Sequence, residues 1–250
     1  MSGSPNIELA GVEVAHEAQP ASAVLHSVCW AIGPGEWWAV CGRPGSGKTS
    51  LLCTGAGLTA PVAGTLRAFG RDYWQSREAE RLALGRRIGF VFDEGGRLFA
   101  HMSILENLVL PLQYHTGCDQ VAAQERALEL LAWIGLEAWA DMAPARLTTA
   151  QRRRAALART LTQPVEVLFL DALLVGLPPE DVQWWLVLLH DLSKREETHG
   201  GPVSIITSDF DLSAWLDWAD RFAVVHDGAF QSLAEPEARA MARHPAGAGI

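Results

Sequence analysis

Short apolar runs bounded by glycine and proline alternate along this chain with stretches in which apolar residues recur at helical spacing. Runs of this kind predict buried strands at residues 36–41, 88–92, 167–171, 203–207 and 222–226. Helix-compatible sequence follows residue 48 and occupies residues 77–87, 121–133, 150–161 and 181–194. Strands that alternate with helices in this way predict an α/β fold with a mostly parallel sheet.

The spacing of these elements predicts one domain over residues 7–234. Its core is expected at 7–92 and 164–234, with a helical subdomain inserted at about 93–163. A chain of 250 residues, 49% of them hydrophobic, is long enough for one sizeable core. Residues 235–250 are rich in alanine, glycine and proline, so we expect a weakly ordered tail there.

Composition narrows the class of protein. A net charge of −9 and a pI near 5.3 argue against nucleic acid as a partner. The four cysteines show no C-x-x-C spacing, which predicts reduced core residues rather than disulfides or zinc ligands. We find no signal peptide and no apolar run of about eighteen residues, so any membrane association is expected through a partner. Apolar surroundings predict core or subunit-interface packing for Trp37, Trp38, Trp184, Trp185, Trp215 and Trp218.

The segment from Gly42 to Thr49 has the spacing G-x-x-x-x-G-K-T of a phosphate-binding loop, between a predicted buried strand and a predicted helix. Glycines let main-chain N–H groups turn inward, and the helix N-terminus favours bound phosphate. Lys48 is expected at the β- and γ-phosphates of ATP, and Thr49 at Mg²⁺. The alternative is a glycine-rich turn with a chance lysine. The candidate nucleotide-binding residues are Gly42, Arg43, Pro44, Gly45, Ser46, Gly47, Lys48, Thr49 and Ser50.

From about Ile7 to Leu233, the order of motifs resembles the ATP-binding subunit of ABC transporters. Blocks at residues 90–99, 104–112 and 153–159 resemble the branch that serves Mla/MCE-type lipid transporters. The resemblance implies a P-loop NTPase fold with antiparallel strands near the N-terminus. It also implies an integral membrane permease, docked in a groove around residues 97–112, and a cytoplasmic location at the inner face of the membrane.

Two ATP-binding subunits of this family meet head to tail, and each signature segment completes the other subunit's ATP site. The family signature is Leu-Ser-Gly-Gly-Gln, and the matching residues are Leu147, Thr148, Thr149, Ala150 and Gln151. Thr149 and Ala150 add Cβ atoms where the main chain should approach phosphate closely, which implies weakened binding. Alternatively, Thr148 and Thr149 cap the following helix, and both roles are compatible.

Several positions that the family uses for hydrolysis are altered. Asp171 matches the aspartate that holds Mg²⁺ through water, the alternative being a simple charge at a strand end. The glutamate expected next is Ala172, which has no acceptor, and the switch histidine is Ser208. The glutamine that senses Mg²⁺ is Asp93, itself a candidate Mg²⁺ ligand, and Pro178 replaces a further aspartate. Losing the general base alone typically lowers the rate about 10²–10⁴-fold.

We therefore expect an ATP-binding subunit of an ABC transporter complex for phospholipids or other MCE-type lipids. It would bind MgATP and hydrolyse it very slowly or not at all. Its second ATP-binding subunit is either an identical chain or a catalytically intact paralogue. One alternative is a working ATPase whose catalytic acid has moved to Asp93, Glu94, Asp209 or Asp211. The other is a soluble scaffold protein that uses ATP only to dimerise.

Overall fold

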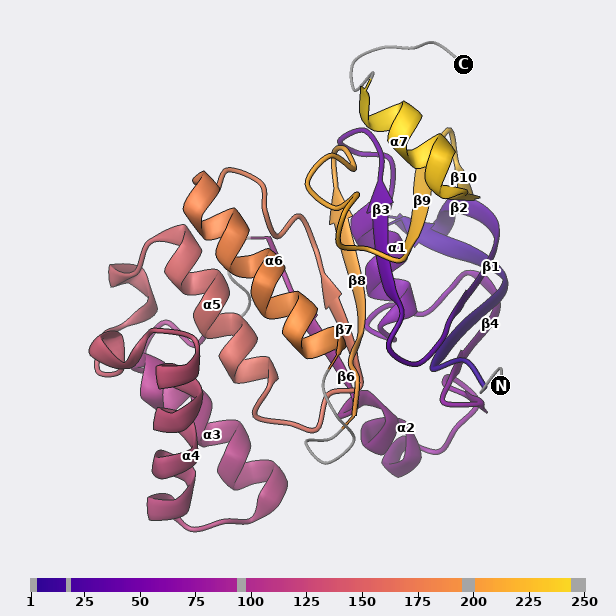
Figure 1. Ribbon diagram of the computed structural model, residues 1–250. Helices are drawn as coiled ribbons and strands as arrows, with labels where there is room; N and C mark the ends of the chain where they lie inside the picture. The colour runs from indigo at the N-terminus through magenta and orange to yellow at the C-terminus, as the bar shows by residue number, and fades with distance from the viewer. Residues whose placement is uncertain (1–3, 17–18, 94–97, 195–200, 244–250) are drawn as a thin grey trace.

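A computed structural model describes residues 4–16, 19–93, 98–194 and 201–243 (Figure 1). Its larger sheet has the strand order β10-β9-β3-β8-β7-β6, parallel except for the β9–β10 hairpin. The strands are β3 (Trp37–Cys41), β6 (Ile88–Val91), β7 (Val167–Leu170), β8 (Ser204–Asp209), β9 (Arg221–His226) and β10 (Ala229–Leu233). The predicted mostly parallel α/β sheet is confirmed. β3 and β7 are buried along their whole length, as their continuous apolar sequence requires.

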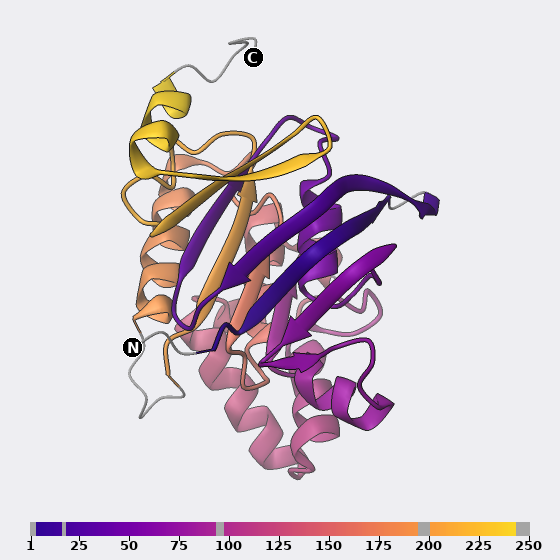
Figure 2. The ribbon, with the colours of Figure 1, turned by 90° about the vertical axis from the view of Figure 1, so that its right-hand side faces the viewer.

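A second, antiparallel sheet has the order β2-β1-β4-β5 and lies beside the first (Figure 2). Its strands are β1 (Ile7–His16), β2 (Gln19–Ile32), β4 (Ala63–Ala68) and β5 (Arg71–Asp72). One buried cluster joins this sheet to helix α1 (Lys48–Gly55) and to one face of the larger sheet; it includes Leu9, Val40 and Leu51. The antiparallel strands implied near the N-terminus are therefore present.

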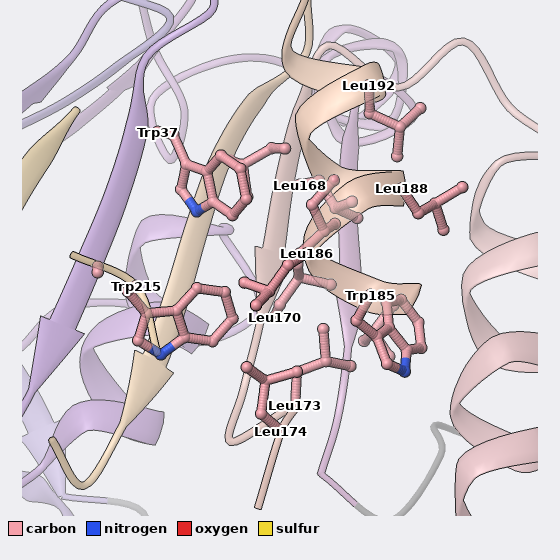
Figure 3. Close-up of a cluster of buried hydrophobic side chains, with 14 of the residues drawn as sticks. Trp37, Leu168, Leu170, Leu173, Leu174, Trp185, Leu186, Leu188, Leu192 and Trp215 are labelled. Carbon is pink, nitrogen blue, oxygen red and sulfur yellow. The ribbon is translucent and has the colours of Figure 1, made fainter. Parts of the chain in front are cut away.

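The other face of the larger sheet packs against helices α6 (Pro179–Ser193) and α7 (Glu235–Arg243). Trp37, Trp185 and Trp215 are fully buried there among leucine side chains (Figure 3). Because neighbouring residues of a strand point to opposite faces, Trp37 lies in this cluster while Trp38 lies in the other. The prediction of core packing for the tryptophan-rich segments is borne out at these positions.

The remaining helices are α2 (Glu78–Gly85), α3 (Ile104–Thr116), α4 (Gln120–Trp133), α5 (Thr149–Thr160) and two short 3₁₀ turns, Glu137–Trp139 and Pro144–Arg146. α3, α4 and α5 share a third buried cluster of their own. α5 also contributes Ala156 and Leu157 to the cluster on the larger sheet, so it joins the helical part to the core. The exact domain boundaries stay a prediction. Among the described residues, no helix is long and apolar enough to cross a membrane.

Two expectations from the sequence need correction. Residues 235–243 form α7 instead of a weakly ordered tail, because Ala238 is fully buried against the core and Arg239 pairs with Glu235 and Asp217. Residues 244–250 lie outside the described part of the chain. The four cysteines are free, but Cys29 is exposed and is not a core residue.

Cys41, at the end of β3, is expected to resist alkylation in the folded protein. Burial raises the pKa of its thiol from 9.0 to about 11, and the thiolate is the reactive form. At pH 8, iodoacetamide should therefore label the exposed Cys29 much faster than Cys41. Because the pKa of the Cys41 thiol is higher in the folded than in the unfolded protein, its contribution to the free energy of unfolding is fully present below pH 9 and is lost as the pH rises towards 11. Peptide mapping by mass spectrometry measures both labelling rates, and equal rates would contradict this burial.

Candidate nucleotide-binding site

The loop between β3 and α1 needs its glycines for conformation and for space. Gly45 and Gly47 have φ of 77° and 101°, in the left-handed region where a side chain is strained. A Cβ on Gly42 would lie 2.4 Å from the Val225 carbonyl oxygen and 2.7 Å from Ser46 Oγ. Gly47 is the N-cap of α1 and makes no side-chain hydrogen bond to the helix, and an N-terminus without a side-chain cap is suited to binding an anion. The strand, loop and helix predicted from the sequence are all present.

Two polar side chains of this loop suit a phosphate group. Ser46 Oγ is buried and has no hydrogen-bond partner among the described residues. Lys48 is also buried, and its Nζ donates to the carbonyl oxygens of Gly42 at 2.7 Å and Arg43 at 3.0 Å. Burial lowers the pKa of Lys48, while the charge of Asp171 opposes that shift. The ammonium group folds back on its own loop, so phosphate oxygens would offer it stronger, charge-assisted partners.

The carboxylate of Asp171 is held from both sides at the carboxyl end of β7. Thr49 Oγ1 donates to Asp171 Oδ2 at 2.8 Å, and Ser208 Oγ donates to Asp171 Oδ1 at 2.6 Å. The parallel pairing of β7 with β8 places Leu170 opposite Thr207, which makes Asp171 and Ser208 neighbours. The structure thus brings together Thr49 and Asp171, two of the three candidate Mg²⁺ residues, and adds Ser208.

Magnesium fits this cluster only together with a nucleotide. Among the described residues, no group of three or more His, Cys, Asp or Glu side chains could hold a metal. Thr49 and Asp171 are oxygen donors of the type that Mg²⁺ prefers, and phosphate oxygens would complete the set. Asp93 is exposed, and the hydrogen bonds that join Thr49 and Ser208 to Asp171 do not involve it. Its role as a further Mg²⁺ ligand stays a prediction.

Two positions altered relative to active family members, Ala172 and Ser208, have no carboxylate, and the described residues include three of the four acids considered as replacements. Ala172 has φ of 46°, unusual for a residue other than glycine, and its N–H donates to Ser208 Oγ at 3.0 Å. Asp209 accepts hydrogen bonds from its neighbour Phe210 and from Trp215 Nε1, and burial raises its pKa. Asp211 accepts a hydrogen bond within its own loop, from the N–H of residue 213. Glu94 lies outside the described residues.

Replacing Ser208 with alanine is expected to lower the free energy of unfolding by about 1–3 kcal/mol, the usual cost of leaving buried polar groups unpaired. Both Asp171 Oδ1 and the Ala172 N–H would lose their partner. The exposed Ser213→Ala is a matched control, because it removes the same hydroxyl without stranding a buried group. Urea denaturation measures both variants, and equal stabilities would show that Ser208 does not hold Asp171.

The signature residues form a helix cap, one of the two roles expected for them. Thr148 Oγ1 accepts the Gln151 N–H at 3.2 Å, and Gln151 Oε1 accepts the Thr148 N–H at 2.9 Å. Thr149 Oγ1 accepts a hydrogen bond from Arg152. α5 and α1 pack on opposite faces of the larger sheet, so the fold does not join this segment to the phosphate loop of its own chain.

Two further residues near the site, Phe210 and Arg153, are not among the candidate site residues predicted from the sequence. The Phe210 ring lies 5.4 Å from Lys48 Nζ, a cation–π distance. Arg153 is buried and donates to main-chain carbonyls of the loops after β6 and β7. Arg153 lies in a run of three arginines at 152–154 and begins the block at 153–159 that resembles the family, but neither pattern assigns it a role.

A family model described as "ABC transporter" matches residues 25–174, which include the phosphate loop, the signature segment and Asp171. The chain belongs to the ABC transporter family. This ABC transporter chain is 31% identical over 208 residues to the methionine import ATP-binding protein MetN 2 of Paraburkholderia xenovorans, covering 83% of this chain and 52% of that protein. It is 33% identical over 216 residues to the sulfate/thiosulfate import ATP-binding protein CysA of Caulobacter vibrioides, covering 85% and 60%. The chain thus spans between half and two thirds of the length of these relatives.

Solved structures show the same ABC fold. Clostridium perfringens cbiO1, described as part of the ABC transporter complex cbiONQ, matches with a TM-score of 0.79 at 21% identity over 95% of this chain and 92% of that one. MJ0796, described as a dimeric bacterial ABC transporter cassette, matches with a TM-score of 0.78 at 25% identity over 91% and 99%. The P-loop NTPase fold of the ABC type, implied by the motif order, is confirmed.

Proposed function

We propose that this chain is the ATP-binding subunit of an ABC transporter complex, and that it binds MgATP with little or no hydrolysis. The observation that carries the proposal is the contrast at Asp171. On one side, Thr49 and the phosphate loop have the groups that hold MgATP. On the other, Ala172 and Ser208 contribute only a methyl group and a hydroxyl that is already bonded to Asp171.

Nucleotide binding needs only a small rearrangement of this loop. Lys48 would exchange the carbonyls of Gly42 and Arg43 for phosphate oxygens, and Ser46 Oγ would gain a partner. Bound Mg²⁺ would supply charge neutralisation of the phosphates. Asp171, with both oxygens engaged and Mg²⁺ to hold, is a poor acceptor for a proton from water. The chain is therefore suited to changing the conformation of the transporter complex through the free energy of MgATP binding, without ATP hydrolysis.

A second ATP-binding subunit is part of the proposal. The signature segment lies away from the phosphate loop of its own chain, and the similar MJ0796 cassette is described as a dimer. An identical partner would give two sites without the glutamate and histidine. An intact paralogue would have one working site completed by Thr148 and its neighbours. ATP turnover by the isolated complex separates the two, because only the mixed pair would hydrolyse.

The proposed permease docks between the core and the helical part, on the cytoplasmic side of the membrane. Phe99 and Leu110 are 38% and 39% exposed there, and a hollow of about 180 Å³ lies beside them, lined in part by Pro111, His115 and Arg159. The buried Asn107 side chain binds the main chain of Phe99 and so fixes the start of this surface. Arg97 falls outside the described residues.

The transported substrate stays a prediction. The blocks at 90–99 and 104–112 favour lipids, whereas MetN 2 and CysA are described as methionine and sulfate/thiosulfate import proteins. Purifying the chain with its membrane partner and analysing the bound lipid decides between these classes. Enrichment of phospholipid over a control membrane protein supports the lipid assignment.

ATP affinity and ATP turnover, measured on the same purified chain, test the central proposal. We expect saturable MgATP binding with turnover far below about 1 s⁻¹, the lower end of the ordinary enzyme range. Turnover near that value would contradict impaired hydrolysis and favour a relocated acid. If the chain binds MgATP, dimerises in an ATP-dependent way and co-purifies with no membrane protein, the scaffold alternative is favoured.

A further inference from the structure

Arg153 lies on α5, the helix that begins with the signature residues, yet its side chain reaches the loops of the nucleotide site. Its Nε donates to the carbonyl oxygen of Asp93, at the end of β6. Its Nη1 donates to the carbonyl oxygens of Leu173 at 2.7 Å and Val175 at 2.8 Å, in the loop that follows Asp171. The guanidinium thus joins three segments that are far apart in the sequence.

A buried guanidinium is costly unless hydrogen bonds satisfy it. Arg153 is only 5% exposed, and the bonds that the described residues give it go to main-chain carbonyls. Its planar fork of donors has a fixed geometry, so it can serve several carbonyls at once only while they keep their relative positions. Movement of either loop would break bonds at a site that water reaches poorly. The contact therefore favours joint movement of the loops and the helix.

The two neighbouring arginines do not make this connection. Arg152 donates to the Leu147 carbonyl oxygen and to Thr149 Oγ1, at the start of its own helix. Arg154 pairs with Asp181 and lies 3.9 Å from the Trp184 ring, both on α6. Of the three, Arg153 alone contacts the segments after β6 and β7 in the described structure, and Arg152 offers a control of identical chemistry.

We infer that Arg153 is a positioning residue that transmits nucleotide occupancy from the loops after β6 and β7 to the helical part of the protein. The inference rests on the proposed function. Asp171 and Ala172 lie in the same short segment as Leu173 and Val175, whose carbonyl oxygens Arg153 binds, so a nucleotide that shifts this segment at Asp171 would shift the acceptors as well. α5 carries the displacement onward, because its Ala155 and Ala158 pack into the cluster shared with α3 and α4.

Hydrogen exchange with and without MgATP tests this role in the full chain. We expect ATP to slow exchange in the phosphate loop and in α3, α4 and α5 of the unaltered protein. In Arg153→Gln, ATP affinity should stay within about threefold and the loop should still be protected, while the response of the three helices is lost. Arg153→Lys, which keeps a charged donor, should restore part of that response, and Arg152→Gln should behave as the unaltered protein.

The outcomes separate this inference from the proposed function. If the unaltered chain does not bind MgATP, the proposed function fails. If it binds MgATP but α3–α5 do not respond, or if they respond equally in Arg153→Gln, the transmission role is overturned and ATP binding stands. If Arg153→Gln loses ATP affinity in proportion to its thermal stability, and Arg153→Lys does the same, Arg153 has only a structural role and the inference is overturned.

Discussion

Replacing Lys48 with alanine is expected to weaken MgATP binding about 100-fold or more. The Lys48 ammonium is buried in the phosphate loop, where its Nζ donates hydrogen bonds to two main-chain carbonyl oxygens at 2.7 and 3.0 Å. Each charge-assisted hydrogen bond to phosphate contributes about 1.5–3 kcal/mol, and two such bonds correspond to about a hundredfold or more in affinity. Calorimetric titration with MgATP measures the change directly.

The chain contains a matched control for this substitution. Its other lysine, Lys194, is exposed at the end of α6, outside the site. Lys194→Ala should bind MgATP as the unaltered protein does. An equal affinity for Lys48→Ala would mean that the loop does not bind the phosphates, and it would remove the basis of the proposed function.

Restoring two side chains, Ala172→Glu together with Ser208→His, is expected to raise ATP turnover by about 10²–10⁴-fold, the usual contribution of a general base. The glutamate supplies an acceptor for a proton from water. Ala172→Glu alone should gain less, because residue 172 has a left-handed φ of 46° and its N–H is bound by Ser208 Oγ. Removing that hydroxyl frees the residue to adopt another conformation.

Phosphate release measures this gain, and the double variant Ala172→Gln with Ser208→His is its control. Glutamine has nearly the same shape as glutamate but accepts no proton, so that variant should stay near background. If the glutamate variant binds MgATP and still shows no added turnover, the altered residues at 172 and 208 are not what limits hydrolysis.

How far the sequence predicts this protein depends on how local each feature is. The phosphate loop is contiguous, and its conformation follows from glycines at 45 and 47 and from the flanking strand and helix. The meeting of Thr49 with Asp171 needed the family resemblance as well, because those residues are 122 positions apart in the sequence. The prediction missed the helix at 235–243 because the pair of Glu235 with Arg239 is a weak local signal, whereas the burial of Ala238 against the core depends on the tertiary structure.

The sequence by itself determined the alternation of strands and helices and the nucleotide-binding loop, and its resemblance to the family led to the prediction that Ala172 and Ser208 replace hydrolytic side chains. Only the tertiary structure decided what replaces them. The parallel pairing of β7 with β8 sets the Ser208 hydroxyl against Asp171, and the packing of α5 against the core sets Arg153 beneath the loops after β6 and β7. Both contacts join residues distant in sequence, and their partners are fixed by strand register and helix packing, which no local pattern encodes.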